Sequence, residues 1–171
     1  LFPLPEISGG LWTTSAAVGF LIGLLLVGSS FLLGYLDVGR ALIKEYGSLG
    51  KSIGWPALFG NAEAPPPTVV AAPAVTIVNF IGTVVGAAII VISIFNALSP
   101  TFAVDALLAK NMIYFFGHVF INASIYMSII AVYEIVPLYT GRPWKSSKIF
   151  LAGWSITLLM VMAVYPHHLF Q

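Results

Sequence analysis

The sequence predicts an all-α fold, a polytopic transmembrane helix bundle. Only 8% of its 171 residues are charged and 59% are hydrophobic, whereas a soluble domain carries about 25% charged residues. The mean hydropathy is +1.00, and four apolar segments reach the roughly 20 residues that a helix needs to cross a bilayer core. So few charges cannot cover a water-facing surface, and we therefore expect a membrane protein.

Each of the four segments is expected to be one span. The first two carry no charge, the third holds Lys110 near its start and Glu134 near its end, and the fourth runs to a histidine pair. The expected spans are about 11–36, 69–98, 106–138 and 149–170. The chain begins at Leu1 and stops at Gln171, so we expect one membrane domain over 1–171, with these four spans belonging to a larger bundle in a longer chain.

The connection between the first two spans is long and polar. Its first part, 39–45, has the composition of a short interfacial helix, and its second part, through Trp55-Pro56 and Pro65-Pro66-Pro67, is typical of a loop. The connections 37–68 and 139–148 fall on the same side of a four-span bundle. They hold six of the seven basic residues, namely Arg40, Lys44, Lys51, Arg142, Lys145 and Lys148. The positive-inside rule therefore predicts that both connections are cytoplasmic and both chain ends point outward.

Composition also excludes some classes of partner and site. The net charge is +1, which gives no indication of nucleic-acid binding, and we expect membrane lipid instead. The sequence contains no cysteine, which excludes disulfides, iron–sulfur clusters and thiolate chemistry.

All three histidines lie within predicted spans. His118 is about a dozen residues into the third span, and His167 and His168 are near the outer end of the fourth. Since these spans run antiparallel, both groups fall in the outer half of the bilayer. Ionisable residues within a membrane are costly and are usually functional. The three histidines therefore predict a shared metal site, with a hydrogen-bonding role for single histidines as the alternative.

The adjacent pair places a condition on this metal site. Consecutive helical residues point about 100° apart, so a regular helix would not aim both rings at one ion. Pro166 precedes the pair and removes a helix hydrogen bond, which allows the rings to converge. Three imidazoles leave an open coordination position, and they suit copper, zinc, iron or nickel.

A second pattern concerns helix packing. Gly82-Thr83-Val84-Val85-Gly86 is a G-x-x-x-G sequence in the second span, which permits close approach of a neighbouring helix. A chance pair in a glycine-rich membrane helix is an equal alternative. We expect Asn79, in the same span, to hydrogen-bond a neighbouring helix and assign it no chemistry.

Three local sequences, in this order and spacing, resemble a known family. They are Phe115-Phe116-Gly117-His118, the turn Tyr139-Thr140-Gly141-Arg142-Pro143, and Pro166-His167-His168-Leu169-Phe170. Over about residues 108–171 the chain resembles the catalytic subunit, subunit I, of the haem–copper oxidase superfamily.

The resemblance implies a function and a set of cofactors. The four spans would correspond to the family's helices four to seven, and His118, His167 and His168 would hold the copper-B ion facing a high-spin haem. The histidines that ligate the low-spin and high-spin haems would lie on helices outside this chain. The implied partners are other oxidase subunits, cytochrome c or a similar electron donor, and O2 or nitric oxide. The implied location is a bacterial or archaeal cell membrane.

Asn122 departs from the family pattern. The main branches have a tyrosine at this position, cross-linked to the first copper ligand, and another branch has its tyrosine where this chain has Val161. Splitting the O–O bond takes four electrons, one of which the tyrosine is thought to supply, whereas reducing nitric oxide to nitrous oxide takes two. The pattern is closest to the divergent branch that holds B-type oxidases and nitric-oxide-reductase-like proteins. We expect reduction of O2 to water, with nitric oxide reduction as the alternative.

Other classes of function remain as alternatives. A transporter would hold metal weakly and pass it along the histidines, and a structural subunit would keep its activity when they are replaced. For Glu134, near the cytoplasmic end of the third span, a solvated interfacial position close to Arg142 is favoured over a place in a proton path.

Overall fold

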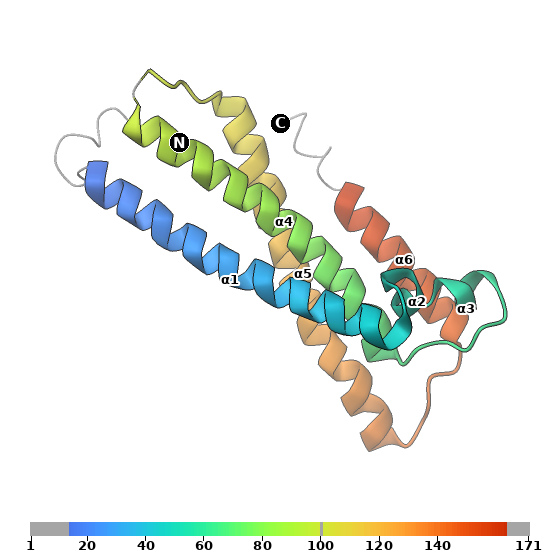
Figure 1. The fold of residues 1–171 in the computed structure, drawn as a ribbon. Coiled ribbons are helices and arrows are strands. Elements are labelled where there is room, and N and C mark those ends of the chain that lie inside the picture. Colours follow the sequence, from blue (N-terminus) through green and yellow to red (C-terminus); the bar gives the residue numbers. More distant parts are fainter. Residues whose placement is uncertain (1–13, 100, 164–171) are drawn as a thin grey trace.

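The computed structural model describes residues 14–99 and 101–163, and every regular element in these ranges is a helix. The long helices are α1 (Thr14–Tyr46), α4 (Pro67–Leu98) and α5 (Ala106–Thr140). A shorter apolar helix is α6 (Ser147–Ala163), and the short helices α2 (Leu49–Ile53) and α3 (Trp55–Phe59) lie between α1 and α4. The predicted all-α bundle is confirmed (Figure 1).

Three of the four predicted spans are confirmed as helices long and apolar enough to cross a membrane, namely α1, α4 and α5. The fourth is observed as α6 up to Ala163, and the rest of its predicted range lies outside the described residues. Helix α1 extends ten residues beyond the predicted end at Leu36. Hydropathy falls at Asp37 and Arg40, but no proline or glycine pair interrupts the helix before Gly47, so the apolar span and the helix end at different places.

The prediction of a loop through Trp55-Pro56 was wrong, because this stretch forms α2 and α3. The Ser48 hydroxyl accepts a hydrogen bond from the backbone N–H of Lys51, which caps the start of α2. Gly54 separates the two helices with φ of 88°, a left-handed conformation that glycine adopts without steric cost. Pro56 lies in the first turn of α3, where its missing N–H costs no hydrogen bond.

Helix α4 is the central element of the bundle, with α1, α5 and α6 packed around it (Figure 1). Its buried face consists mainly of small and β-branched side chains, including Val70, Ala71, Ala74, Val75 and Val78. Small side chains allow helices to approach closely, which favours association of membrane helices through van der Waals contact. In contrast, no residue of α1 is buried, although α1 packs along α4.

The basic residues lie mainly at one end of the bundle, as the sequence predicted. The end of α1, the start of α4, the end of α5 and the start of α6 lie at one end of the bundle, together with α2 and α3 (Figure 1). The six basic residues of the two connections belong to this end, whereas Lys110 belongs to the start of α5 at the opposite end. The cytoplasmic assignment of the basic end stays a prediction.

Candidate metal centre

Helix α5 carries the first predicted metal ligand, and its ends are well defined. A carboxylate oxygen of Asp105 accepts a hydrogen bond from the Leu108 N–H at 2.6 Å and caps the start of the helix. Gly141, with φ of 61°, ends it in a left-handed cap within the predicted Thr-Gly-Arg-Pro turn. His118 is half-buried, twelve residues after the first residue of the helix.

Two neighbours of His118 fix its turn of α5 against α4. Val119 is almost fully buried, with 2% of its surface exposed, and its side chain lies against Gly82. The ring of Phe116 lies against Gly86. The G-x-x-x-G sequence is therefore confirmed as a site of close helix approach, and the approach takes place at the level of His118.

The face of α5 that carries His118 also carries Asn122. Residues four apart lie one above the other on a helix, so Asn122 is one turn from His118, and it too is half-buried. Tyr126 follows one turn later on the same face, about 12 Å along the axis from His118 by the helical rise. An amide therefore lies one turn after the histidine, and the tyrosines on this face are Tyr114, one turn before His118, and Tyr126, two turns after it.

Helix α6 runs antiparallel to α5 with a register that aromatic contacts define. Tyr126 and Trp154 meet edge to face with ring centroids 5.8 Å apart, and Tyr133 and Phe150 do so at 5.0 Å. His118 lies eight residues before Tyr126, and Ala163 lies nine residues after Trp154. Equal steps in opposite directions along antiparallel helices reach about the same level. The last described residues of α6 therefore lie near the level of His118.

Of the three predicted ligands, the structure describes only His118. His167 and His168 lie outside the described residues, four and five positions after the end of α6. Within residues 14–99 and 101–163, no three of His, Asp and Glu come together in a way that could hold a metal ion. The structure therefore places only the first predicted ligand, and it describes α6 up to Ala163.

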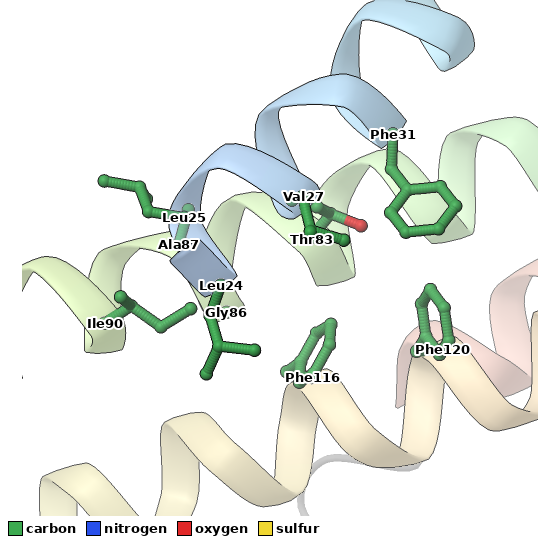
Figure 2. Close-up of a pocket in the computed structure, with 11 residues that line it drawn as sticks. Leu24, Leu25, Val27, Phe31, Thr83, Gly86, Ala87, Ile90, Phe116 and Phe120 are labelled. Atoms are coloured by element: carbon green, nitrogen blue, oxygen red, sulfur yellow. The ribbon is translucent and has the colours of Figure 1, made fainter. Parts of the chain in front are cut away.

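An apolar cavity lies on the other side of α5, between α1, α4 and α5 (Figure 2). Its volume is about 180 Å³, and among its described lining residues only Thr83 has a polar side chain. Phe116 and Phe120 line it from α5. These two residues are each two positions from His118, about 200° around the helix, so the cavity and the imidazole lie on different faces of α5. The sequence patterns did not predict this cavity.

Sequence analysis also missed a cluster of aromatic rings at the basic end. Tyr133 of α5 meets Trp144, Phe150 and Trp154 edge to face, with centroid distances of 5.4, 5.0 and 6.2 Å. The spacing of the aromatic residues in 126–133 and 144–154 could have predicted this cluster, because positions seven or eight apart share a helix face. The cluster joins α5 to α6 where the two backbones are otherwise far from each other.

Two predictions about polar residues can be compared with the structure. Asn79 was expected to bond a neighbouring helix, and its amide N–H does donate to the sulfur of Met127 on α5 at 3.9 Å. Glu134 accepts a hydrogen bond from the Thr68 hydroxyl of α4. Its carboxylate is exposed, as the interfacial interpretation requires, but Thr68 and not Arg142 is its partner among the described residues.

Comparison with protein families identifies the chain. The sequence model of the family described as "Cytochrome C and Quinol oxidase polypeptide I" matches residues 2–171. The chain belongs to this family. Membership makes it a subunit I of the haem–copper oxidase type, an integral membrane oxidoreductase, from a family that binds haem and copper. Searches of curated proteins and of solved structures found no significant match.

The described part of the site suits the copper that this oxidase family binds. His118 supplies an imidazole within a long apolar helix, and imidazole is a common ligand of copper. Its helix turn is held against α4 by Val119. The described part of the chain therefore supplies one donor of a type that copper accepts, and the other two predicted donors lie outside the described residues.

Proposed function

We propose that this chain is part of the catalytic subunit of a respiratory terminal oxidase, in which His118, His167 and His168 hold copper and O2 is reduced to water. The observation that carries the proposal is the register of α5 and α6. His118 and the end of α6 lie at about the same level, and His167 follows Ala163 by four residues. Membership of the oxidase family supports copper and haem as the cofactors of this reaction.

The copper, when bound, supplies a one-electron redox centre with an open position for the gas. Two residues of this chain, His118 and Asn122, lie at that position in this proposal. His118 binds the metal through a ring nitrogen of its imidazole. Asn122, one turn away, offers an amide that donates and accepts hydrogen bonds but cannot give up an electron with its proton.

The cavity between α1, α4 and α5 also supports a small apolar substrate. An apolar cavity of comparable size remains dry and takes up apolar molecules. The 180 Å³ cavity has an almost wholly apolar lining, and O2 and nitric oxide are both small and weakly polar. This property fits either gas and excludes neither.

Nitric oxide reduction is the second candidate, and Asn122 favours it. Reduction of O2 to water consumes four electrons, and the expected tyrosine that would supply one of them is absent from position 122. Two-electron reduction of nitric oxide has no need of that residue. On this reading, the chain belongs to the nitric-oxide-reductase-like side of the B-type branch.

The same assignment implies an electron donor, partner subunits and a membrane for this chain. The electron donor is cytochrome c or a similar small carrier, the haem ligands and further subunits come from outside this chain, and the membrane is a bacterial or archaeal cell membrane. The basic end of the bundle, with connections 37–68 and 139–148, faces the cytoplasm in this proposal. The asymmetry of six basic residues against one supports that orientation.

The test uses the intact complex supplied with a reduced electron donor, and measures consumption of O2 and, without oxygen, of nitric oxide. Rapid O2 uptake with little nitric oxide turnover identifies a terminal oxidase and requires another residue to replace the missing tyrosine. The opposite result identifies a nitric oxide reductase. The variant His118→Ala should lose copper and both activities, and a variant that keeps its copper would exclude His118 as a ligand.

A further inference from the structure

We propose that the contact of Phe116 with Gly86 positions the turn of α5 that bears His118. The contact fixes how this turn is rotated about the axis of α5 and how far it lies from α4. Gly82 and Val119 form the second half of the same contact. The inference rests on the proposed copper ligand His118, and it assigns a function to two glycines and one aromatic ring that do not touch the metal. All the residues that carry it lie in α4 and α5.

The first half of the contact leaves no room for a side chain on Gly86. A Cβ atom built there would lie 2.7 Å from Cδ2 and 2.9 Å from Cγ of the Phe116 ring. Observed Cβ atoms essentially never come within 3.0 Å of another heavy atom. Rotation of the ring about its own axis cannot relieve the overlap, because Cγ lies on that axis. The ring therefore rests directly on the α4 backbone.

The second half of the contact lies one turn away along α4. A Cβ atom on Gly82 would lie 2.8 Å from Cγ1 and 3.3 Å from Cβ of Val119. The β-branched side chain of Val119 is stiff at its first torsion, so this contact cannot yield by a simple rotamer change. Phe116 and Val119 precede and follow His118 in the sequence, and the two glycines therefore hold α5 on both sides of the histidine.

Additional rings pack beside Phe116 and line the same cavity. The centroids of Phe116 and Phe120 are 5.5 Å apart, and Phe120 meets Phe31 of α1 edge to face at 6.2 Å. Tilted and edge-to-face pairs at these distances are favourable beyond the area they bury. The Phe116 ring, which lines the cavity of Figure 2, therefore cannot move away from Gly86 without losing these contacts.

The geometry makes His118 sensitive to this contact. By the 100° step of the helix, His118 points roughly 130° around α5 from the midpoint of Phe116 and Val119, so its imidazole faces away from α4. A methyl group on Gly86 would push the ring outward by about 0.7 Å to restore the ordinary 3.4 Å contact. Ligands of a functional site must be held within about 0.5 Å and 10–20°. If the turn of α5 moves with the ring, His118 is displaced by more than this tolerance.

The glycines of α1 provide the matched controls. Cβ atoms on Gly19, Gly23 or Gly34 would meet nothing within 4 Å in the described part of the chain. Replacing glycine by alanine in any of these helices gives the same gain in helix propensity. The difference between Gly86→Ala and Gly23→Ala therefore isolates the contact with Phe116.

The experiment uses the intact complex and two measurements besides turnover. These are the copper retained during dialysis against a chelator, and the infrared band of carbon monoxide added as a probe to the reduced protein. We expect Gly86→Ala to retain copper about 10- to 100-fold less tightly, as for residues that orient metal ligands, and to shift or broaden the band. Gly23→Ala should leave both unchanged. The double variant Gly86→Ala/Phe116→Ala removes the overlap together with the ring, so it should return copper retention and the position of the band toward the parent values while the band stays broad.

The outcomes separate this inference from the proposed function. If His118→Ala keeps its copper, the proposed ligand is wrong and the positioning inference falls with it. If His118→Ala loses copper while Gly86→Ala keeps both the copper and the band of the parent, only the positioning inference is overturned. Failure of the double variant to return the position of the band toward that of the parent overturns it too.

A further variant decides the question if Gly86→Ala does not assemble. Phe116→Leu keeps Gly86, adds no atoms and removes the ring that rests on α4. We expect the complex to assemble and the carbon monoxide band to broaden, because the His118 turn loses its fixed rotation. A band as narrow as that of the parent, at the same position, would overturn the inference.

Discussion

Trp154 of α6 packs edge to face against Tyr126 of α5, with ring centroids 5.8 Å apart. Trp154 has only 7% of its surface exposed, and it also meets Tyr133, seven residues or about two turns further along α5, at 6.2 Å. A single indole therefore contacts α5 at two positions about two turns apart. Because α5 and α6 share few other contacts, this residue contributes much of the direct packing between the two helices.

Replacing this residue should weaken the α5–α6 pairing. We expect Trp154→Ala to lower the free energy of unfolding by about 3–5 kcal/mol, the usual cost of deleting a buried aromatic side chain. Chemical denaturation of the detergent-solubilised complex, followed by tryptophan fluorescence, measures this change. Trp144→Ala is the control, since Trp144 is 44% exposed, and it should cost about 1 kcal/mol. Equal losses in the two variants would contradict the role of Trp154.

Asn79 should tolerate an apolar replacement. Its side chain is 1% exposed, and among residues 14–99 and 101–163 its Oδ1 has no hydrogen-bond partner and its N–H donates to the Met127 sulfur at 3.9 Å. Replacing an incompletely paired buried polar group by an apolar one of similar shape is close to neutral or stabilising. We expect Asn79→Leu to leave the free energy of unfolding unchanged or to raise it by about 1 kcal/mol. A loss of more than this would reveal a partner for Oδ1 in the assembled complex.

Gly54 and Gly141 form a natural pair for a stability experiment, because both have positive φ, of 88° and 61°. A Cβ atom on Gly54 would overlap the buried side chain of Leu151 and lie 3.3 Å from Cδ of Pro65, whereas one on Gly141 would meet nothing within 4 Å. We expect Gly141→Ala to cost about 1–2 kcal/mol, from the left-handed backbone alone. Gly54→Ala should cost roughly 1–3 kcal/mol more, because Leu151 must move.

The denaturation midpoints of the two alanine variants measure this difference. Equal midpoints would mean that Leu151 relaxes without cost and that the α2–α3 turn is not packed tightly on α6.

Glu134 should not act as a proton relay. It lies exposed at the basic end, where the Thr68 hydroxyl donates a hydrogen bond to it. The amide of Glu134→Gln retains an acceptor for Thr68, so the local structure should persist, and turnover should remain within about twofold with the same pH profile. Loss of a proton-transferring group instead costs about 100-fold or more. Turnover of the purified complex, measured across pH, separates the two interpretations.

Much of this fold follows from the sequence because hydropathy and helix length obey simple rules in a membrane. The spans at α4 and α5 match their helices within two residues at each end, whereas α1 continues past its apolar stretch to Tyr46. Helices α2 and α3 were not predicted, since each has five residues and depends on local capping by Ser48 and on the Gly54 turn. Short helices carry too few residues for a periodic pattern.

The sequence predicted which residue types form the candidate site, but it did not predict which residues hold them in position. His118 stood out because histidine is rare within membrane spans. Phe116 did not, since an apolar ring in an apolar helix gives no signal, and its importance depends on contact with Gly86. The G-x-x-x-G sequence indicated close approach by some neighbour, but only the register of α4 against α5 shows that the neighbour is the turn next to His118.

The length of α1 has a consequence for how this end of the bundle responds to the lipid around it. Its 33 residues span roughly 50 Å, against a hydrocarbon thickness of about 30 Å. The excess places Asp37, Arg40 and Lys44 among the headgroups, on the same unbroken helix as the apolar stretch. A thicker or thinner bilayer therefore tilts α1 as one body and displaces the α2–α3 segment, whose Trp55 is hydrogen-bonded to Ser155 of α6 at 3.3 Å.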